Sequence, residues 1–286
     1  MKNYSFINAP TLPDALDALD RLREKAWLVA GGTNVMVFIR AGKRDGTTLV
    51  NIRDITALSG ISEKDGIVTI GAGTTISAIA SSDILKESAP GLYAVANQFA
   101  DPTTRNSATI GGNVANGTAG GDMLPSLLVL DAIAHVESKA DGRREIPLSE
   151  IFTGPGKTSI ASNEILTHLT FRATRHIGAI KLGARKSMSI AIATVAAYVE
   201  MKDDTIASCR IALGAVSATP GRARNAEAAV TGRKLDNDTF DLLAVALQKD
   251  MSPRDPSVRS TASYRRSVVP VLVKRAMMLA ATGECM

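Results

Sequence analysis

Two glycine-rich segments carry the residues best suited to binding an anion: residues 28–34 (LVAGGTN) and 105–113 (RNSATIGGN). In each segment, an apolar run typical of a strand leads to a Gly-Gly pair that is followed by Thr or Asn. Because glycine has no side chain, its backbone N–H groups can approach a negative charge that a side chain would block. We therefore expect the two segments to form one site for a nucleotide that contains a diphosphate.

The spacing of these glycines excludes the two commonest nucleotide-binding turns. Neither segment continues into the Gly-Lys-Ser/Thr of a P-loop, and neither has the G-x-G-x-x-G pattern of a Rossmann turn. A single Gly-Gly pair is more often only a tight turn, and this structural interpretation stays open for each segment alone. A third turn, Gly120-Gly121-Asp122, favours binding, because the Asp122 carboxylate could accept hydrogen bonds from ribityl or ribose hydroxyls.

The composition is that of an ordinary globular protein of about two domains, with 286 residues, 45% of them hydrophobic and 21% charged. The net charge is +5, but the basic residues are spread along the chain, with a modest cluster at Arg254, Arg259, Arg265 and Arg266. With only 4% aromatic residues, this pattern argues against a nucleic-acid-binding face.

Cysteine and histidine usage predicts neither a disulfide framework nor a metal site. The two cysteines are Cys209 and Cys285, and the three histidines show no metal-ligand spacing. No long apolar run predicts export or membrane insertion. We therefore expect a cytoplasmic protein that does not bind membranes.

The first half of the chain alternates between helical and strand patterns. Residues 13–23 are expected to form a helix capped by Thr11, and residues 27–30 a buried strand, so the first glycine pair lies at the carboxyl end of a strand. Strands are also predicted at 48–52, 67–70, 132–137 and 165–171, and helices at 76–85 and 91–99. An apolar run at 126–129 leads into the strand at 132.

The pattern changes after about residue 175. Apolar runs at 192–201 and 206–216, separated by the turn residues 202–205, predict an antiparallel hairpin. Helices are expected at 223–230, 239–247 and 264–281. We predict an α+β protein with one domain at 1–174, divided into subdomains of about 1–56 and 57–174, and a second at 175–286.

The ordered motifs resemble those of the FAD-binding medium subunits of molybdenum hydroxylases, the family of xanthine dehydrogenase, nicotinate dehydrogenase and carbon monoxide dehydrogenase. The resemblance covers essentially the whole chain. Six segments carry it: residues 30–34, residues 105–113, Asp122 with Pro125, residues 163–166 (NEIL), residues 181–191 (KLGARKSMSIA) and residues 264–266 (YRR).

This resemblance implies a role for each matching residue. It implies a two-subdomain, PCMH-type FAD-binding fold, followed by an antiparallel sheet with a helical bundle. The residues expected around the FAD diphosphate are Leu28, Val29, Ala30, Gly31, Gly32, Thr33, Asn34 and Val35 on one side, and Thr109, Ile110, Gly111, Gly112 and Asn113 on the other, with Ala100 close by.

Three further side chains are expected near the cofactor. The resemblance implies that Asp122 holds a cofactor hydroxyl, that Leu166 packs against the isoalloxazine ring, and that Lys181 is a positive partner near the flavin or adenine end. Lys157 is a weaker candidate at the border of the ring. Two alternatives stay open, because Leu166 fits a core strand position equally well, and Lys181 and Arg185 could belong to a solvated face.

The implied function is electron transfer. The chain has no evident acid/base, nucleophile or metal constellation, so no catalytic residue is expected, and a flavin would supply the chemistry. The resemblance implies a large molybdenum-cofactor subunit and a small [2Fe-2S] subunit as partners, and NAD⁺ or another electron acceptor. Because the glycine turns contain no histidine, we expect FAD to be non-covalent. The alternatives are a flavin-free assembly protein and a stand-alone flavin reductase such as UDP-N-acetylenolpyruvylglucosamine reductase.

Overall fold

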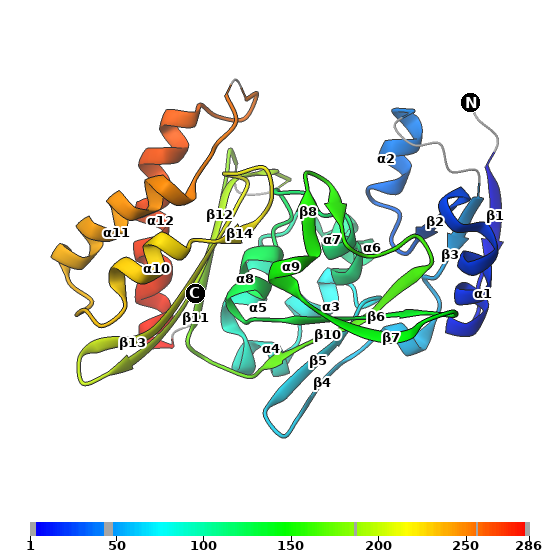
Figure 1. Ribbon diagram of the computed structural model, residues 1–286, viewed down its shortest axis with the longest axis horizontal. Helices are drawn as coiled ribbons and strands as arrows, with labels where there is room; N and C mark the ends of the chain where they lie inside the picture. The colour runs from blue at the N-terminus through cyan, green and yellow to red at the C-terminus, as the bar shows by residue number, and fades with distance from the viewer. Residues whose placement is uncertain (1–3, 43–47, 186–187, 256, 284–286) are drawn as a thin grey trace.

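The computed structural model describes residues 4–42, 48–185, 188–255 and 257–283, and it confirms an α+β fold. Figure 1 shows three units in a row, each built on its own sheet. The N-terminal unit contains β1 (Ser5–Asn8), α1 (Leu12–Leu22), β2 (Ala26–Val29), α2 (Val35–Arg40) and β3 (Thr48–Asn51). No helix in these described ranges is both long and apolar enough to cross a membrane.

The N-terminal unit is a parallel sheet of strand order β1-β3-β2, covered by α1. The predicted helix at 13–23 is confirmed with a shift of one residue. Thr11 caps it as expected, with its hydroxyl oxygen accepting from the Asp14 N–H at 3.3 Å. Leu16 and Leu19 lie on the buried face of α1 and anchor it to the sheet.

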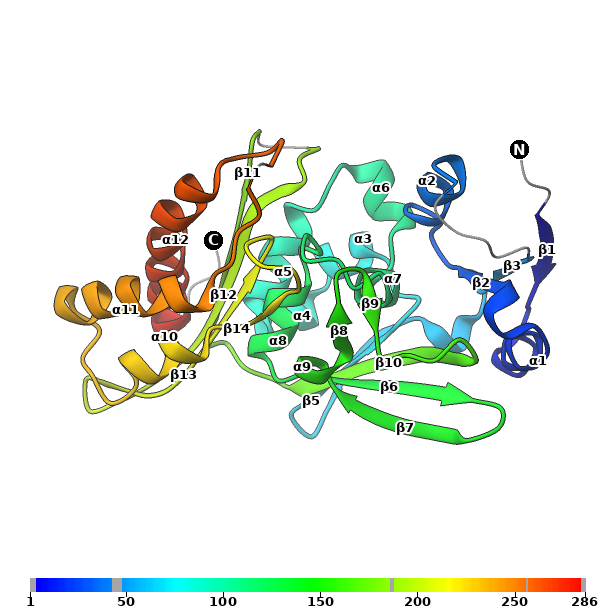
Figure 2. The ribbon, with the colours of Figure 1, turned by 45° about the horizontal axis from the view of Figure 1, so that its top comes forward.

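The central unit is an antiparallel sheet of order β4-β5-β10-β6-β7 with short helices on one face (Figure 2). Its strands are β4 (Ile61–Lys64), β5 (Ile67–Gly71), β6 (Ile133–Ser138), β7 (Gly142–Pro147), β8 (Phe152–Gly154), β9 (Lys157–Thr158) and β10 (Glu164–Arg172). Its helices are α3 (Ile76–Ala80), α4 (Asp83–Ser88), α5 (Pro90–Asn97), α6 (Pro102–Ser107), α7 (Ile110–Ala115), α8 (Leu124–Val129) and α9 (Leu148–Ile151).

One prediction for this unit is wrong, and one apolar run that had no assigned form is a helix. The helix expected at 76–85 is two helices, because Ser82 caps a new one by accepting from the Leu85 N–H at 3.2 Å. The apolar run at 126–129 lies in α8 and is fully buried, so it shows no amphipathic period that would distinguish helix from strand.

The C-terminal unit is a sheet of order β11-β12-β13-β14 with helices against one face. It contains β11 (Ile177–Gly183), β12 (Ala191–Lys202), β13 (Thr205–Gly214), β14 (Gly221–Arg222), α10 (Arg224–Val230), α11 (Asn237–Asp250) and α12 (Ala262–Thr282). The predicted hairpin is confirmed as β12 and β13. Asp203 and Asp204, with φ of 49° and 61°, make its tight turn.

Strand β12 is buried on both faces. Its Ala196 side chain belongs to the core of the central unit, whereas Val195 and Ala197 belong to the core beneath the C-terminal helices. A strand covered on both sides is nearly continuously apolar, as residues 191–197 of β12 are apart from Thr194. In β13, burial raises the pKa of the Cys209 thiol to about 12, and Cys285 lies outside the described residues.

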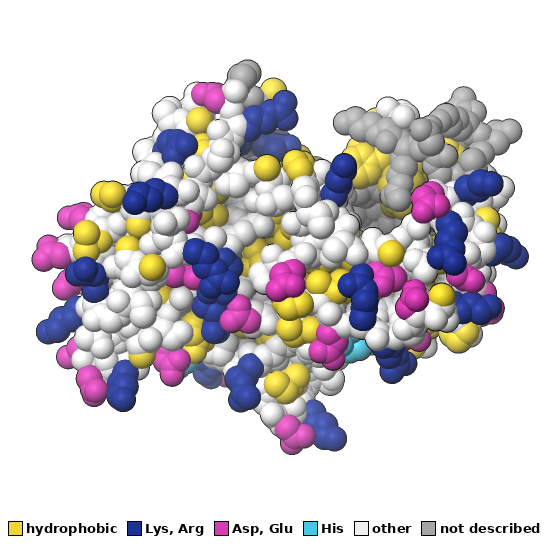
Figure 3. Space-filling model, in the orientation of Figure 1, with side chains coloured by type: hydrophobic (Ala, Val, Ile, Leu, Met, Phe, Trp, Pro, Cys, Tyr) yellow, Lys and Arg dark blue, Asp and Glu magenta, His cyan; other side chains and the backbone are white. Residues whose placement is uncertain are grey.

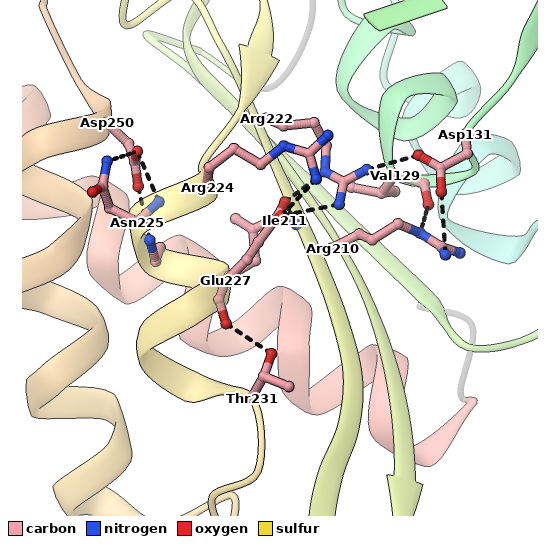
Figure 4. A network of polar contacts seen from close by, with 11 residues as sticks. Val129, Asp131, Arg210, Ile211, Arg222, Arg224, Asn225, Glu227, Thr231 and Asp250 are labelled. Carbon is pink, nitrogen blue, oxygen red and sulfur yellow. Dashed lines mark hydrogen bonds and ion pairs between the residues drawn. The ribbon is translucent and has the colours of Figure 1, made fainter. Parts of the chain in front are cut away.

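A network of charged side chains joins the central and C-terminal units (Figure 4). Asp131, in the turn after α8, pairs with Arg222 at 2.7 Å and with Arg210 at 3.2 Å. Arg210 also donates to the Val129 carbonyl at 2.6 Å, at the C-terminal end of α8. Behind these contacts, the Glu227 carboxylate accepts from Arg222 and from the Ile211 N–H at 2.9 Å. The network therefore fixes α8 against the C-terminal sheet.

The Glu227→Gln variant should lose about 3 kcal/mol of unfolding free energy, because it removes the buried carboxylate partner of the buried Arg222 guanidinium and leaves only the exposed Asp131. Chemical denaturation measures this loss. Arg224→Gln is the matched control, since Arg224 contacts the same carboxylate from an exposed position and its removal should change stability by about 0.5 kcal/mol or less. Equal losses in the two variants would contradict the role of burial.

Two histidines that are distant in sequence stack on the central sheet. The rings of His135 in β6 and His168 in β10 lie 4.1 Å apart and nearly parallel, at 8°. Thr170 lies 2.8 Å from His135 Nε2, and Thr167 lies 2.9 Å from His168 Nδ1. The exposed Glu145 carboxylate lies 3.5 Å from His135 Nδ1. Burial lowers the pKa of both imidazoles, and for His168 the neighbouring His135 lowers it further, while Glu145 acts in the opposite direction.

Stability should therefore depend on pH through this pair. Because the folded pKa values lie below the unfolded value of about 6.5, the folded state binds fewer protons. The contribution is complete above the unfolded pKa and is lost as the pH falls through the folded pKa values. Thermal unfolding between pH 8 and pH 5 should show a shallower loss of Tm in His135→Gln/His168→Gln than in the parent. An identical slope in both proteins would exclude this pair as the cause.

Candidate functional site

The two glycine-rich turns lie directly against each other. A Cβ atom at Gly31 would fall 1.7 Å from the carbonyl oxygen of Ser107 and 3.0 Å from the backbone nitrogen of Ala108. Backbone thus packs on backbone at this point, and any side chain at position 31 would force the turns apart. The structure therefore brings together the two segments that sequence analysis assigned to one site.

The first turn presents a row of free hydrogen-bond donors. Among the residues that the structure describes, none accepts a hydrogen bond from the backbone N–H groups of residues 31–35. Gly32 has a φ of +69°, and Thr33 and Asn34 are exposed, so this backbone is open to a ligand. Helix α2 follows at once and adds the partial positive charge of its N-terminus. Such an arrangement of N–H groups suits the phosphate oxygens of a dinucleotide.

The structure of the second turn differs from the one that the sequence predicts. Its glycine pair does not follow a strand but lies in the first turn of α7, whose N-cap Thr109 accepts from the Gly112 N–H at 3.1 Å. The Ile110 and Gly111 N–H groups donate to Thr74 and Ala72 carbonyls at 3.0 and 2.8 Å. The expectation of bare N–H groups in both turns is therefore wrong for the second, whose donors hold it on the turn after β5.

One polar atom of the second turn does lack a partner. The side-chain oxygen Oδ1 of Asn113 is buried and has no hydrogen-bond partner. It faces the third turn, since a Cβ at Gly121 would lie 3.1 Å from it. An orphaned acceptor costs free energy unless a donor reaches it. Hydroxyl groups of a bound nucleotide would satisfy this oxygen.

Asp122 and Lys181 form a buried ion pair at the edge of this site. Their atoms Oδ2 and Nζ lie 2.7 Å apart, and the two side chains are 8% and 5% exposed. Lys181 also donates to the Gln98 carbonyl at 3.1 Å, and Thr194 donates to the second carboxylate oxygen at 3.5 Å. Burial raises the pKa of Asp122, and the Lys181 cation opposes this effect. The alternative of a solvated face is therefore wrong for Lys181.

The remaining predicted residues have different surroundings. Leu166 is 6% exposed and belongs to the main core, beside a bulge in β10. Ala100, with a φ of +40°, accepts from the Met188 N–H at 3.2 Å, which ties the loop after α5 to the loop after β11. Lys157 is exposed in β9, whose backbone packs against Gly117. Of the 181–191 motif, residues 186–187 lie outside the described ranges.

Sequence analysis missed Thr194 as a residue of the site. It is 1% exposed in β12, among apolar neighbours, and its hydroxyl reaches the Asp122 carboxylate. The available signal was a single polar residue inside a continuous apolar strand, because a buried hydroxyl needs a partner.

The site lies where the units meet. On the face drawn in Figure 3, the surface is hollowed at the top, between the C-terminal lobe and the N-terminal lobe. Free backbone donors on the first turn, an orphaned acceptor on the second and a buried ion pair beside them suit a diphosphate with ribityl or ribose hydroxyls. These residues fit FAD.

Comparison with known proteins supports the same conclusion. The family model "FAD binding domain in molybdopterin dehydrogenase" matches residues 2–171. The chain belongs to the FAD-binding medium subunits of molybdenum hydroxylases. The model "CO dehydrogenase flavoprotein C-terminal domain" matches residues 178–280 of this subunit.

Relatives match this medium subunit over nearly its whole length. The xanthine dehydrogenase FAD-binding subunit of Escherichia coli O157:H7 is 30% identical, covering 95% of this chain and 94% of its own. The carbon monoxide dehydrogenase medium chain of Afipia carboxidovorans is 31% identical and is covered over 96% of both chains. The solved structure of reconstituted CO dehydrogenase from Oligotropha carboxidovorans superimposes with a TM-score of 0.93 at 29% identity, over 99% of both chains.

Gly32→Val should reduce the FAD content of the purified subunit about tenfold or more, because a β-branched residue strains the left-handed backbone of the first turn and its side chain enters the site. The flavin-to-protein absorbance ratio measures this change. Gly66→Val is the matched control, since Gly66 has a φ of +73° in the β4–β5 hairpin with open space around it. Full FAD retention in Gly32→Val, or an equal loss in both variants, would refute the assignment of the first turn.

Proposed function

We propose that this chain is the electron-transfer subunit of a multi-subunit molybdenum hydroxylase, an oxidoreductase that acts on CH or CH2 groups. The partners are a large subunit with the molybdenum cofactor and a small subunit with [2Fe-2S] clusters. When bound, FAD takes up electrons singly or in pairs and so links those clusters to NAD⁺ or another acceptor. The observation that carries this proposal is the row of unpartnered N–H groups at residues 31–35, directly against the second turn.

The chain's own residues bind and orient the cofactor rather than transfer protons. The first turn contacts the diphosphate, and the residues from Thr109 to Asn113 contact it from the other side. Asp122 accepts a hydrogen bond from a hydroxyl of the cofactor, and Lys181 supplies a positive charge at the same end of the site. Two carboxylate oxygens with several acceptor positions leave room for a cofactor hydroxyl beside the Lys181 and Thr194 contacts. FAD is held non-covalently, and substrate oxidation requires the partner subunits.

We further propose a domain boundary near residue 175, with an FAD-binding domain at 1–174 and a second domain at 175–286. The support is the change of sheet between β10, which ends at Arg172, and β11, which begins at Ile177. We propose a cytoplasmic location, because the sequence has only two cysteines and predicts no disulfide framework.

The test is to purify the tagged chain from its host together with its partners. We expect two further subunits and the absorbance of both flavin and iron–sulfur clusters, and bleaching of both on addition of an oxidisable substrate. The isolated chain should bind FAD and show no turnover of that substrate.

The alternatives give different results in the same experiment. If the chain is folded but colourless and does not bind added FAD, a flavin-free assembly protein becomes the better interpretation. If the isolated flavin-loaded chain oxidises NADPH steadily, a stand-alone reductase becomes the better interpretation.

A further inference from the structure

The C-terminal motif at residues 264–266 contains two adjacent arginines in very different environments. Arg266 is satisfied within the chain, since its guanidinium donates to the Gln248 and Met251 carbonyls at 3.2 and 3.3 Å, at the end of α11. Arg265 is only 3% exposed, and its Nε atom is buried without a hydrogen-bond partner. Among the described residues its one side-chain hydrogen bond is from Nη2 to the neutral Ser257 hydroxyl, at 3.2 Å.

No carboxylate lies within ion-pair distance of Arg265 in the described part of the chain. Asp255 favours the cation from a longer distance, but burial and the nearby Arg259 cation lower the pKa of Arg265. The helix adds a second unfavourable effect. Arg265 lies in the first turn after the N-cap Thr261 of the 21-residue α12, where the partial positive charge of the helix repels a cation.

A second polar atom at the start of α12 also lacks a partner. Ser260 directly precedes the N-cap, and its Oγ atom is buried with no hydrogen bond. Side chains at this position and at the fourth helical residue, which is Arg265, normally pack against each other as an apolar staple. Here the staple positions hold a hydroxyl and a cation, and both have donor capacity left over. The buried guanidinium of Arg265, with a donor left unsatisfied, calls for an anionic acceptor.

The surface around this pair has the composition of a protein contact. Arg254 and Arg259 are exposed, Val258 is fully exposed, and the Tyr264 ring is 45% exposed. Figure 3 shows basic, hydrophobic and acidic side chains together at the top of the C-terminal lobe. Tyrosine and arginine are enriched at protein interfaces.

We infer that Arg265 is the docking point for a carboxylate of a partner subunit, an Asp or Glu side chain that pairs with the guanidinium group when the complex assembles. The inference rests on the proposed function, which supplies partner subunits. The uncompensated cation destabilises the isolated chain, and the carboxylate of the partner converts it into a paired one. The exposed Arg254 and Arg259 outnumber the exposed Asp255 in the segment before α12, and the remaining positive charge favours an acidic partner surface.

The test compares Arg265→Met with Arg266→Met, which change the same residue type at adjacent positions. In the isolated, flavin-loaded chain, Arg265→Met should raise the Tm by about 3 °C, because it replaces an unpaired buried cation with an apolar side chain. Arg266→Met should lower the Tm, because it removes two hydrogen bonds from the end of α11. A fall of Tm in Arg265→Met would show that this arginine is satisfied within the chain and would overturn the inference.

The second measurement uses the co-purified complex. The partner subunits should bind the Arg265→Met chain about tenfold more weakly than the parent chain. Their affinity for the parent chain should also fall more steeply as the salt concentration rises. Equal affinity would overturn the inference, whereas the absence of any complex with the parent chain would instead overturn the proposed function. A rise of Tm on adding inorganic phosphate or NAD⁺ to the parent, absent in Arg265→Met, would assign the site to a free phosphate and would also overturn it.

Discussion

The close backbone contact between Gly31 and the Ser107–Ala108 peptide is the constraint on which the site depends. It joins two units that are built on separate sheets, and it does so without a side chain in between. Because the second turn is held on the turn after β5 by its own N–H groups, it forms a rigid support. The N–H groups of the first turn are then free for a ligand.

The C-terminal unit stabilises this arrangement by holding both ends of α8. At the N-terminal end, Asp122 contacts Lys181 of β11 and Thr194 of β12. At the C-terminal end, the Asp131 carboxylate and the Val129 carbonyl contact Arg210 and Arg222. A six-residue helix is about 9 Å long, so these two sets of contacts fix its position and its direction. The third glycine turn, directly before α8, is therefore positioned by residues of the C-terminal unit.

Buried charge in this subunit is otherwise compensated. Lys181 has Asp122, and Arg222 has Glu227, and each of these four groups also has a further hydrogen bond or ion pair. Against this background, the buried Arg265 is an exception in the part of the chain that the structure describes. Other buried atoms without a partner, such as Asn113 Oδ1 and Ser260 Oγ, are neutral, whereas Arg265 carries a charge, and this difference is the basis of the inferred contact with a partner subunit.

The sequence alone determined the features that depend on neighbouring residues. The cap at Thr11, the hairpin of β12 and β13 and the C-terminal helices follow local rules of capping, turns and periodicity, and the motifs of the site predicted the FAD-binding family. Local patterns could not decide the helical form of the buried run in α8 or of the second glycine turn, because a fully apolar or glycine-rich segment has no distinguishing period. The pairing of Asp122 with Lys181, and the solitary position of Arg265, were decided only by the tertiary structure. Coulomb and hydrogen-bond energies act over a few ångströms, and only the folded chain brings such distant residues within that distance, or leaves one without a partner.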